Sequence, residues 1–334
     1  HGSRATLLLS YMERRMRRWP TYLMYHRVLA ANECEGYPFP SLVMPADEFE
    51  QQVAWLARHA EVVTAAEAAR RGRSAGANAD RPVVAITFDD GYADNYVVAA
   101  PILERHGLRA TFFLASDFVG TGSLLWYDHA ALMVAHNDDQ RLCDWAESCG
   151  MKQPLPEDMA GDRVAAWVEL LKQTAPQIRR AWLAAAASGS GTIASDSYRA
   201  MRPEDAADLV RRGHEVASHS VGHEILPLLD DDALVAELER SRQAIAEWIA
   251  GPVAGVCYPD GSYHDRVVAA TRAAGYGYAC TTQSPYAVAH AGGGGDDMLI
   301  GRVDLNRSRV TRASGRFDLV AFRAELSGLH DWLR

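Results

Sequence analysis

Lysine, closely spaced cysteines and long apolar runs are scarce in this chain of 334 residues. Lysine occurs only at Lys152 and Lys172, and the formal net charge is −9. That charge argues against a general nucleic-acid-binding protein, which needs a basic face to neutralise phosphates. No apolar run approaches the roughly 18–20 residues that cross a bilayer, so we expect no transmembrane segment.

The five cysteines are an odd number without a CxxC pair. A disulfide framework is therefore not expected, although Cys143 and Cys149 could close a small loop. Residues 1–19 are interpreted as a tag remnant, His1-Gly2-Ser3, followed by a short basic segment. Because no signal peptide is visible, the cytoplasm is the expected location. A native signal removed upstream would instead place the protein in the envelope or periplasm.

Seven short runs predict buried strands, because they are rich in apolar, β-branched and aromatic residues and are bounded by turn residues. They are Tyr22–His26, Val83–Phe88, Ala110–Ala115, Glu215–His219, Gly255–Pro259, Tyr278–Thr282 and Ile300–Leu305. Helical patterns lie between most of them, which favours parallel pairing through right-handed crossovers. Seven or eight such units predict an α/β fold, a closed or partly closed barrel with its chemistry at the C-terminal ends of the strands.

The regular alternation is interrupted between about residues 120 and 198. This stretch has a helical pattern around Val164–Leu183 and then a run of small residues, Ala184–Gly191. We interpret it as a helical insertion between two barrel strands, not as a second domain. Residues 20–334 are thus expected to form one barrel domain that carries this insertion.

Two polar motifs stand at the ends of predicted strands. Asp89 and Asp90 follow Val83–Phe88, and adjacent carboxylates in that position need a positive group to balance them. His219 and His223 are four residues apart, so one helical turn or a tight loop can aim both imidazoles at one point. Alone, each motif is more often a turn or a capping pair. Together they should face one rim of the barrel, with one aspartate binding an ion and its neighbour moving a proton.

The predicted donor set is that of a catalytic metal. Two histidines and one aspartate make three protein ligands and leave room for water. Imidazole and carboxylate suit Zn²⁺, with Co²⁺, Ni²⁺ and Fe²⁺ as alternatives. Such an ion lowers the pKa of bound water towards ~7 and polarises a substrate carbonyl.

These motifs resemble the first two motifs of the polysaccharide deacetylase family, carbohydrate esterase family 4 with its NodB-homology domain. The segments Pro101–Leu103, Ala110–Leu114 and Tyr258–Gly261 are also similar to that family. The resemblance extends from about Tyr22 to the C-terminus. It implies a distorted (β/α)7-8 barrel and a metal-dependent N-deacetylase.

The resemblance also implies a role for each residue of the two motifs. Asp90, His219 and His223 would be the metal ligands, and Asp89 would be the general base. The residue chemistry agrees, since an aspartate beside a cation should stay ionised and ready to accept a proton.

His26 is the predicted general acid, because it ends the strand Tyr22–His26 and points to the same rim. An early Tyr-His pair also resembles the permuted branch of the family, in which this motif moves to the N-terminus. We expect a nearby carboxylate to raise the pKa of the imidazole and keep it protonated. The alternatives are a structural histidine at His26 and a late acid at His330.

The third motif departs from the family pattern. An arginine that orients the catalytic aspartate is common there, but this chain has Cys257 or a neighbour at that place. Asp260 stands where an aromatic residue is common. Arg302 could supply the positive charge from the last strand, and it could equally form a structural ion pair with Asp304.

Several residues near this rim are candidates for contacts with substrate. Aromatic rings at Trp126, Tyr127 and Tyr263 could stack on a sugar, although aromatics in an insertion also build its own core. A backbone N–H in the turn Pro259–Gly261 could stabilise an oxyanion. The complete predicted set is Tyr258, Pro259, Asp260, Gly261, Trp126 and Tyr263.

The expected activity is hydrolysis of the acetamide of an N-acetylated amino sugar, as a saccharide, a polymer or a carrier-linked form. A deformylase, or a hydrolase of another small linear or cyclic amide, would use the same residues on a different substrate. A third possibility is an inactive metal-binding or carbohydrate-binding module. Such a module would be expected to have lost Asp89 or a ligand, and all of these residues are present. The sequence carries no signal of oligomeric state.

Overall fold

The computed structural model describes residues 19–72, 81–152, 162–190, 198–311 and 317–328. The N-terminal basic segment up to residue 18 and the alternative acid His330 lie outside these ranges. Among the described residues, no helix is both long and apolar enough to cross a bilayer. All five cysteines are free, so Cys143 and Cys149 are not bonded to each other.

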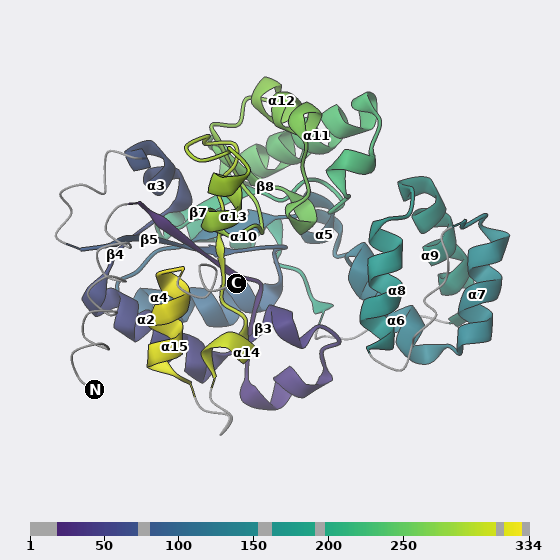
Figure 1. Ribbon diagram of the computed structural model, residues 1–334, viewed down its shortest axis with the longest axis horizontal. Helices are drawn as coiled ribbons and strands as arrows, with labels where there is room; N and C mark the ends of the chain where they lie inside the picture. The colour runs from purple at the N-terminus through teal and green to yellow at the C-terminus, as the bar shows by residue number, and fades with distance from the viewer. Residues whose placement is uncertain (1–18, 73–80, 153–161, 191–197, 312–316, 329–334) are drawn as a thin grey trace.

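A curved parallel sheet forms the centre of the molecule (Figure 1). Its strands run in the spatial order β10-β1-β5-β6-β7-β8-β9. Their bounds are β1 (Thr21–Tyr25), β5 (Val83–Phe88), β6 (Thr111–Leu114), β7 (Glu215–Ser218), β8 (Gly255–Cys257), β9 (Tyr278–Cys280) and β10 (Val303–Asp304). A further strand, β4 (Glu61–Val63), pairs with the first half of β5, and β2 (Arg27–Leu29) pairs separately with β3 (Val43–Pro45).

The last strand segment connects the two ends of this sheet. Ile300 forms a parallel bridge with Cys280 of β9, and Val303 pairs with Leu23 of β1. The sheet therefore curls into the distorted (β/α) barrel that the alternation of strands and helices predicts. All seven predicted strands are present. Strand β5 ends at Phe88 as predicted, whereas β1 and β7 each end one residue earlier than predicted, because His26 and His219 leave the ladder for the loops at the rim.

Helices surround the sheet (Figure 1). They are α2 (Ala46–His59), α3 (Ala65–Arg71), α4 (Ala100–Arg105), α5 (Ser116–Thr121), α10 (Pro203–Arg211), α11 (Asp231–Ile249), α12 (Asp265–Ala273), α13 (Pro285–His290), α14 (Arg307–Val310) and α15 (Leu319–Leu326). The long helix α11 begins where the Asp230 carboxylate accepts a hydrogen bond from Ala233 N, and it ends at Ala250 in the left-handed conformation.

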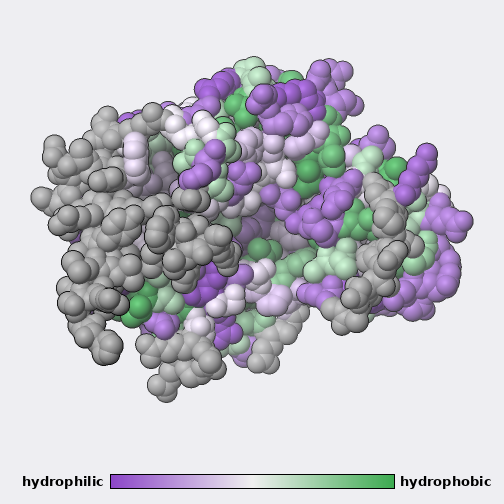
Figure 2. All heavy atoms as spheres, viewed as in Figure 1, coloured by the Kyte–Doolittle hydropathy of each residue, from purple (hydrophilic) through white to green (hydrophobic). Residues whose placement is uncertain are grey.

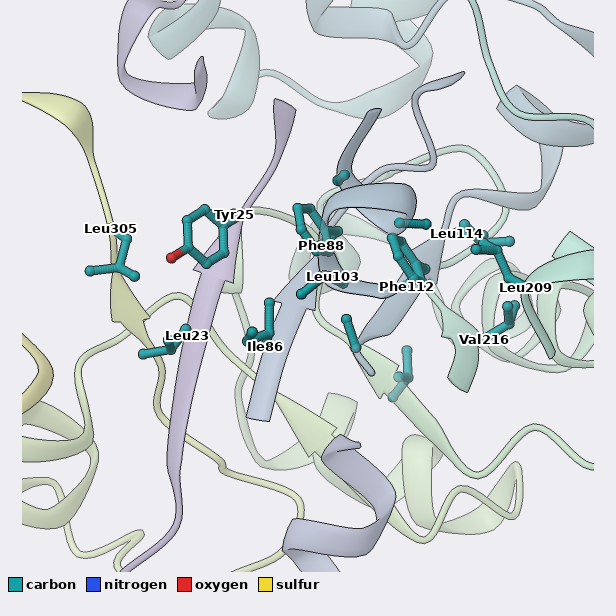
Figure 3. Close-up of a cluster of buried hydrophobic side chains, with 14 of the residues drawn as sticks. Leu23, Tyr25, Ile86, Phe88, Leu103, Phe112, Leu114, Leu209, Val216 and Leu305 are labelled. Atoms are coloured by element: carbon teal, nitrogen blue, oxygen red, sulfur yellow. The ribbon is translucent and has the colours of Figure 1, made fainter. Parts of the chain in front are cut away.

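Alternation along the strands builds two separate apolar layers. Large residues of β1, β5 and β6 pack with helix residues such as Leu103 and Leu209 in the main core (Figure 3). The opposite side chains form a second cluster that includes small residues, among them Ala85, Ala217 and Cys257. Small side chains in this second layer leave space there for one large polar side chain.

The described residues of the predicted insertion form four helices, at one side of the barrel in Figure 1. They are α6 (Trp126–His136), α7 (Asp139–Ser148), α8 (Arg163–Lys172) and α9 (Pro176–Ser190). Trp167 and Trp182 stack at 5.6 Å in its core. The same apolar cluster also takes in Tyr92 and Ile225 from barrel loops. Figure 2 shows the surface hollowed between the barrel and the insertion. The predicted domain limits, residues 20 and 334, stay a prediction.

Candidate metal centre and active site

The turn after β5 sends two neighbouring carboxylates in different directions. Asp90 has a φ of 78° and Gly91 a φ of 98°, so the backbone passes through the left-handed region directly after Asp89. A Cβ on Gly91 would lie 2.8 Å from a methyl carbon of Val119, which restricts this position to glycine. Asp89 and Asp90 are each 1 % exposed.

The two histidines after β7 lie in a tight loop, which is one of the two conformations that their spacing predicts. Ser220 and His223 both have positive φ, at 66° and 55°. The Glu237 carboxylate of α11 accepts hydrogen bonds from Val221 N at 2.9 Å and Gly222 N at 3.1 Å. These bonds fix the loop so that the His219 and His223 rings lie 4.8 Å apart.

Asp90 and the two histidines converge on one point. Asp90 Oδ1 lies 3.5 Å from Nε2 of His219 and 3.5 Å from Nε2 of His223. That oxygen is buried and has no hydrogen-bond partner. His219 Nδ1 lies 2.8 Å from the Cys257 carbonyl, which fixes the tautomer with Nε2 as a free lone pair. A divalent cation fits this set, because it would satisfy the unpaired oxygen and both nitrogens.

Burial keeps the two histidines neutral and disfavours the charge on Asp90. It lowers the pKa of His219 and lowers that of His223 further, so both imidazoles are neutral and able to act as ligands. Burial and then the charge of Asp89 raise the pKa of Asp90 well above its usual value. A cation beside Asp90 Oδ1 would counter that unfavourable environment and stabilise the carboxylate.

Asp89 is held by a buried arginine from the far end of the chain. Arg302 Nη1 donates to Asp89 Oδ1 at 2.7 Å, and Arg302 Nη2 donates to Asp89 Oδ2 at 2.6 Å. Burial by itself would raise the pKa of Asp89, but the Arg302 guanidinium outweighs it and holds the pKa below its usual range. The alternative partner, Asp304, faces Arg309 at 3.9 Å instead. Arg302 therefore stands where it can orient Asp89.

Cys257 leaves room for Arg302, the residue directly before β10, to reach Asp89. Its Sγ lies 3.0 Å from Arg302 Nη2 and 3.7 Å from Asp89 Oδ2. Burial raises the pKa of this thiol well above its usual value, so it is neutral. A small neutral side chain at the third-motif position thus leaves the space that the Arg302 guanidinium occupies.

His26 lies at the rim beside Asp89, with Nε2 3.8 Å from Asp89 Oδ2. The prediction that its pKa is raised is wrong. Burial lowers the pKa to about 4, and the charges of Arg302 and His219 add to that effect against the opposing influence of Asp89. The imidazole is therefore unprotonated at neutral pH and has to gain a proton before it can donate one.

Two predicted substrate contacts are enclosed by protein. Tyr258 is 0 % exposed and its hydroxyl donates to the Met298 carbonyl at 3.1 Å. Trp126 is 8 % exposed, and Arg179 lies over its ring at 4.4 Å. The prediction that the Trp126 ring is an open stacking face is therefore wrong, and the Tyr258 side chain, predicted as a substrate contact, is packed inside the protein as well. Trp126 Nε1 instead donates to the His223 carbonyl at 2.8 Å.

The remaining predicted contacts lie in the loop after β8. Pro259 and Gly261 are buried, and a Cβ on Gly261 would lie 2.0 Å from Thr282 Oγ1. Asp260 is exposed at the loop tip and forms an ion pair with Lys172 of α8 at 2.6 Å. Tyr263 is half-buried. Asp260 and Tyr263 are thus the members of the predicted set that reach the surface.

The insertion contributes residues that sequence reasoning assigned differently or missed. Tyr127 was a candidate for sugar stacking, but its hydroxyl donates to Asp90 Oδ2 at 2.8 Å. Arg179 and Arg180 of α9 both form ion pairs with Glu224, the residue after His223. No spacing rule links these helices to the metal motifs, since the contacts arise only when the insertion packs against the barrel.

A buried Asp-His-His set at the C-terminal ends of barrel strands, next to an arginine-held aspartate, defines a barrel with a candidate hydrolytic metal site. A family model described as "Polysaccharide deacetylase" matches residues 76–154 and 156–279. The chain belongs to the polysaccharide deacetylase family, which is a family of hydrolases.

A curated relative, YxkH of Bacillus subtilis, is 32% identical over 114 residues. The match covers 34% of this chain and 38% of the relative. The chain thus spans well under half of that relative's length.

Solved structures of deacetylases share the fold. The Streptococcus pyogenes deacetylase PplD, in complex with acetate, is 16% identical with a TM-score of 0.54, covering 84% of this chain and 90% of its own. IcaB from Ammonifex degensii is 16% identical with a TM-score of 0.55, covering 93% and 97%. A polysaccharide deacetylase from Bacillus cereus is 16% identical with a TM-score of 0.55, covering 92% and 68%.

Proposed function

We propose that this protein is a metal-dependent N-deacetylase that hydrolyses the acetamide of an N-acetylated amino sugar. The observation that carries the proposal is the division of labour between Asp89 and Asp90. Asp90 lies with two neutral histidines around an unsatisfied oxygen, whereas Asp89 is ionised and held by Arg302. A metal-dependent hydrolytic site uses both arrangements, one for a cation and one for a base.

Asp90, His219 and His223 would hold the cation, and two imidazoles with one carboxylate favour Zn²⁺. When bound, it would supply a Lewis acid that polarises the substrate carbonyl.

Asp89 is the proposed base. Its ionised carboxylate accepts a proton from the attacking water, and the two hydrogen bonds from Arg302 fix its orientation. Each carboxylate oxygen has lone pairs beyond those that the arginine uses, so Asp89 can still accept this proton. A strongly held carboxylate is a weak base, which makes its orientation the larger part of its contribution.

His26 is the proposed donor to the leaving amine. Because it is neutral at rest, it takes up a proton during the reaction and then passes it on. Its position 3.8 Å from Asp89 gives a short route for that proton. The position of His26 directly after β1 also supports membership of the permuted branch of the family, which we include in the proposal.

The turn after β8 is the proposed oxyanion site. Pro259 has no N–H, and Gly261 N donates to the Tyr258 carbonyl at 2.8 Å. The Asp260 N–H is therefore the candidate donor of this turn for the developing oxyanion. Tyr263 is the remaining candidate for a stacking contact with a sugar ring.

Acetate release from defined substrates tests the reaction. The probes are N-acetylglucosamine, its oligomers, and nucleotide- and lipid-linked forms, each incubated with the metal-loaded protein. The acetate in the related S. pyogenes structure favours acetyl as the group removed. Release of formate from N-formyl analogues, without acetate release, would instead support a deformylase. Activity on another small amide alone would support the wider hydrolase alternative.

Two substitutions test the assignment of roles. Asp89→Asn should abolish turnover while bound metal, measured by elemental analysis, stays at the unmodified level. His219→Ala should lose both metal and turnover. Near-normal turnover of Asp89→Asn would contradict the role of Asp89 as the base. The cytoplasmic location and the substrate's carrier stay predictions.

A further inference from the structure

Tyr127 connects the helical insertion directly to the candidate metal centre. It is the second residue of α6, it is 7 % exposed, and its hydroxyl donates to Asp90 Oδ2 at 2.8 Å. Its ring also packs against the His223 ring at 5.2 Å. The residue before it, Trp126, donates to the His223 carbonyl at 2.8 Å. Consecutive residues of one helix thus contact two of the three proposed ligands.

The hydrogen bond from Tyr127 makes the two oxygens of Asp90 unequal. Oδ2 has a donor, whereas Oδ1 is buried without one and lies 3.5 Å from both histidine nitrogens. We infer that Tyr127 is a positioning residue that restricts Asp90 to binding the cation through Oδ1 alone. One-oxygen binding leaves a coordination position for water or substrate that two-oxygen binding would occupy. This inference rests on the proposed metal site.

Buried hydroxyl and carboxylate groups pack behind Tyr127 and limit where its hydroxyl can move. Tyr92 lies 2.9 Å from it, hydroxyl to hydroxyl, and Tyr92 donates to Asp128 Oδ2 at 2.5 Å. Tyr37 donates to the other oxygen of Asp128 at 2.9 Å. All of these side chains are buried. The network joins the loop after β5 to α6, so the orientation of Asp90 depends on how the insertion packs.

The side chain at position 127 matters through its hydroxyl and not only through its ring. Phenylalanine would retain most of the packing against His223. It would leave Asp90 Oδ2 buried without a donor, so the carboxylate would no longer be held in the orientation in which Oδ1 faces the two histidines. Tyr127→Phe is therefore the informative substitution.

The matched control is Tyr96→Phe. Tyr96 also donates from its hydroxyl to an aspartate, Asp208 Oδ2 at 2.9 Å, but it does not contact the ligand set. Metal affinity is measured by competition with a chelator, for Zn²⁺ and for Co²⁺, and folding by circular dichroism. Tyr127→Phe should bind Zn²⁺ and Co²⁺ roughly 10–100-fold more weakly than the unmodified protein. The d–d absorption of bound Co²⁺ should also change shape and intensity, because it reports coordination number. Tyr96→Phe should match the unmodified protein in metal affinity and in the Co²⁺ spectrum.

Equal affinity and an equal Co²⁺ spectrum in Tyr127→Phe would overturn the inference. If that variant does not fold, X-ray absorption on the Zn²⁺ form of the unmodified protein decides the question. Scattering from the carboxylate carbon separates one-oxygen from two-oxygen binding, and two-oxygen binding would overturn the inference. These measurements use no substrate. A protein without deacetylase activity whose Tyr127→Phe variant still shows both changes would therefore contradict the proposed function but retain the inference.

Discussion

Two adjacent carboxylates lie in opposite electrostatic environments. Asp89 is in the barrel interior, and Asp90 is at the interface with the insertion. Inside the barrel, a guanidinium 213 residues away along the chain binds both oxygens of Asp89. At the interface, a neutral tyrosine 37 residues away binds one oxygen of Asp90 and leaves the other unpaired. The pKa of Asp89 is lowered below its usual range, and that of Asp90 is raised.

Neighbouring positions in sequence can thus acquire separate chemical roles from the elements packed against them. Environments that move two pKa values apart are a common basis for assigning different roles to paired acids. Here the positive charge of Arg302 keeps Asp89 ionised without a metal ion, whereas Asp90 needs a metal ion to stay ionised. Substitutions on one side should therefore leave the other side largely intact.

The largest effect is expected from Arg302→Met. It leaves the buried Asp89 carboxylate without its guanidinium, so the free energy of unfolding should fall by about 3–5 kcal/mol. Denaturant unfolding measures this loss, and adding Asp89→Asn should recover much of it. Zn²⁺ affinity should stay within about threefold of the unmodified protein, since the contacts of Asp90 are unchanged. A drop in affinity as large as that of Tyr127→Phe would show that the two sides are coupled.

Arg309→Met is the control for removing an arginine near the same strand. Arg309 is partly exposed and forms two long ion pairs, at 3.9 Å to Asp304 and 3.8 Å to Glu325, so its contribution should be about 1 kcal/mol or less. A loss comparable to that of Arg302→Met would mean that burial of the Arg302–Asp89 pair is not the cause.

An intermediate effect on the free energy of unfolding is expected from Asp128, on the insertion side, as the pH changes. Burial raises the pKa of Asp128 from its usual 3.8 to about 6. The folded state therefore binds a proton that the unfolded state has released between these values, and stability falls as pH rises through them. In metal-free protein, Asp128→Asn should gain about 1–3 kcal/mol relative to the unmodified protein between pH 4 and pH 7.

Urea unfolding across that pH range measures the difference. Asp128→Asn also alters the hydrogen bonds with Tyr37 and Tyr92. Their effect on the free energy of unfolding does not change with pH, so it does not affect how the difference between the two proteins varies with pH. A difference that shrinks as pH rises would contradict the raised pKa of Asp128.

The smallest effect on stability is expected from Lys172→Met. This lysine joins α8 to the loop after β8 through Asp260, but both side chains are about one-third exposed. The ion pair should contribute no more than about 0.5–1 kcal/mol to stability. If this loop borders the substrate, KM should change while kcat stays within about twofold. Lys152→Met, in the same insertion, is the matched control, and an equal change in KM there would exclude a specific role for Lys172.

Much of the fold was predictable because each barrel strand is a short apolar run followed by a helical pattern. The strands around Phe88 and Leu114 were located this way, and the prediction of a distorted barrel with a helical insertion is confirmed by the structure. The convergence of Asp90 with His219 and His223 also followed from their places at strand ends. The pKa of His26 did not, because desolvation depends on everything packed around the ring.

The sequence by itself determined the residue types, the order of strands and helices, and the placement of Asp89, Asp90, His219 and His223 at one rim. These features follow from local periodicity and from the direction shared by parallel strands. Tertiary structure decided which groups hold the two aspartates. Arg302 reaches Asp89 only after the barrel closes around Cys257, and Tyr127 reaches Asp90 only after the insertion packs. Both contacts join distant segments, and no local pattern encodes the distance between them.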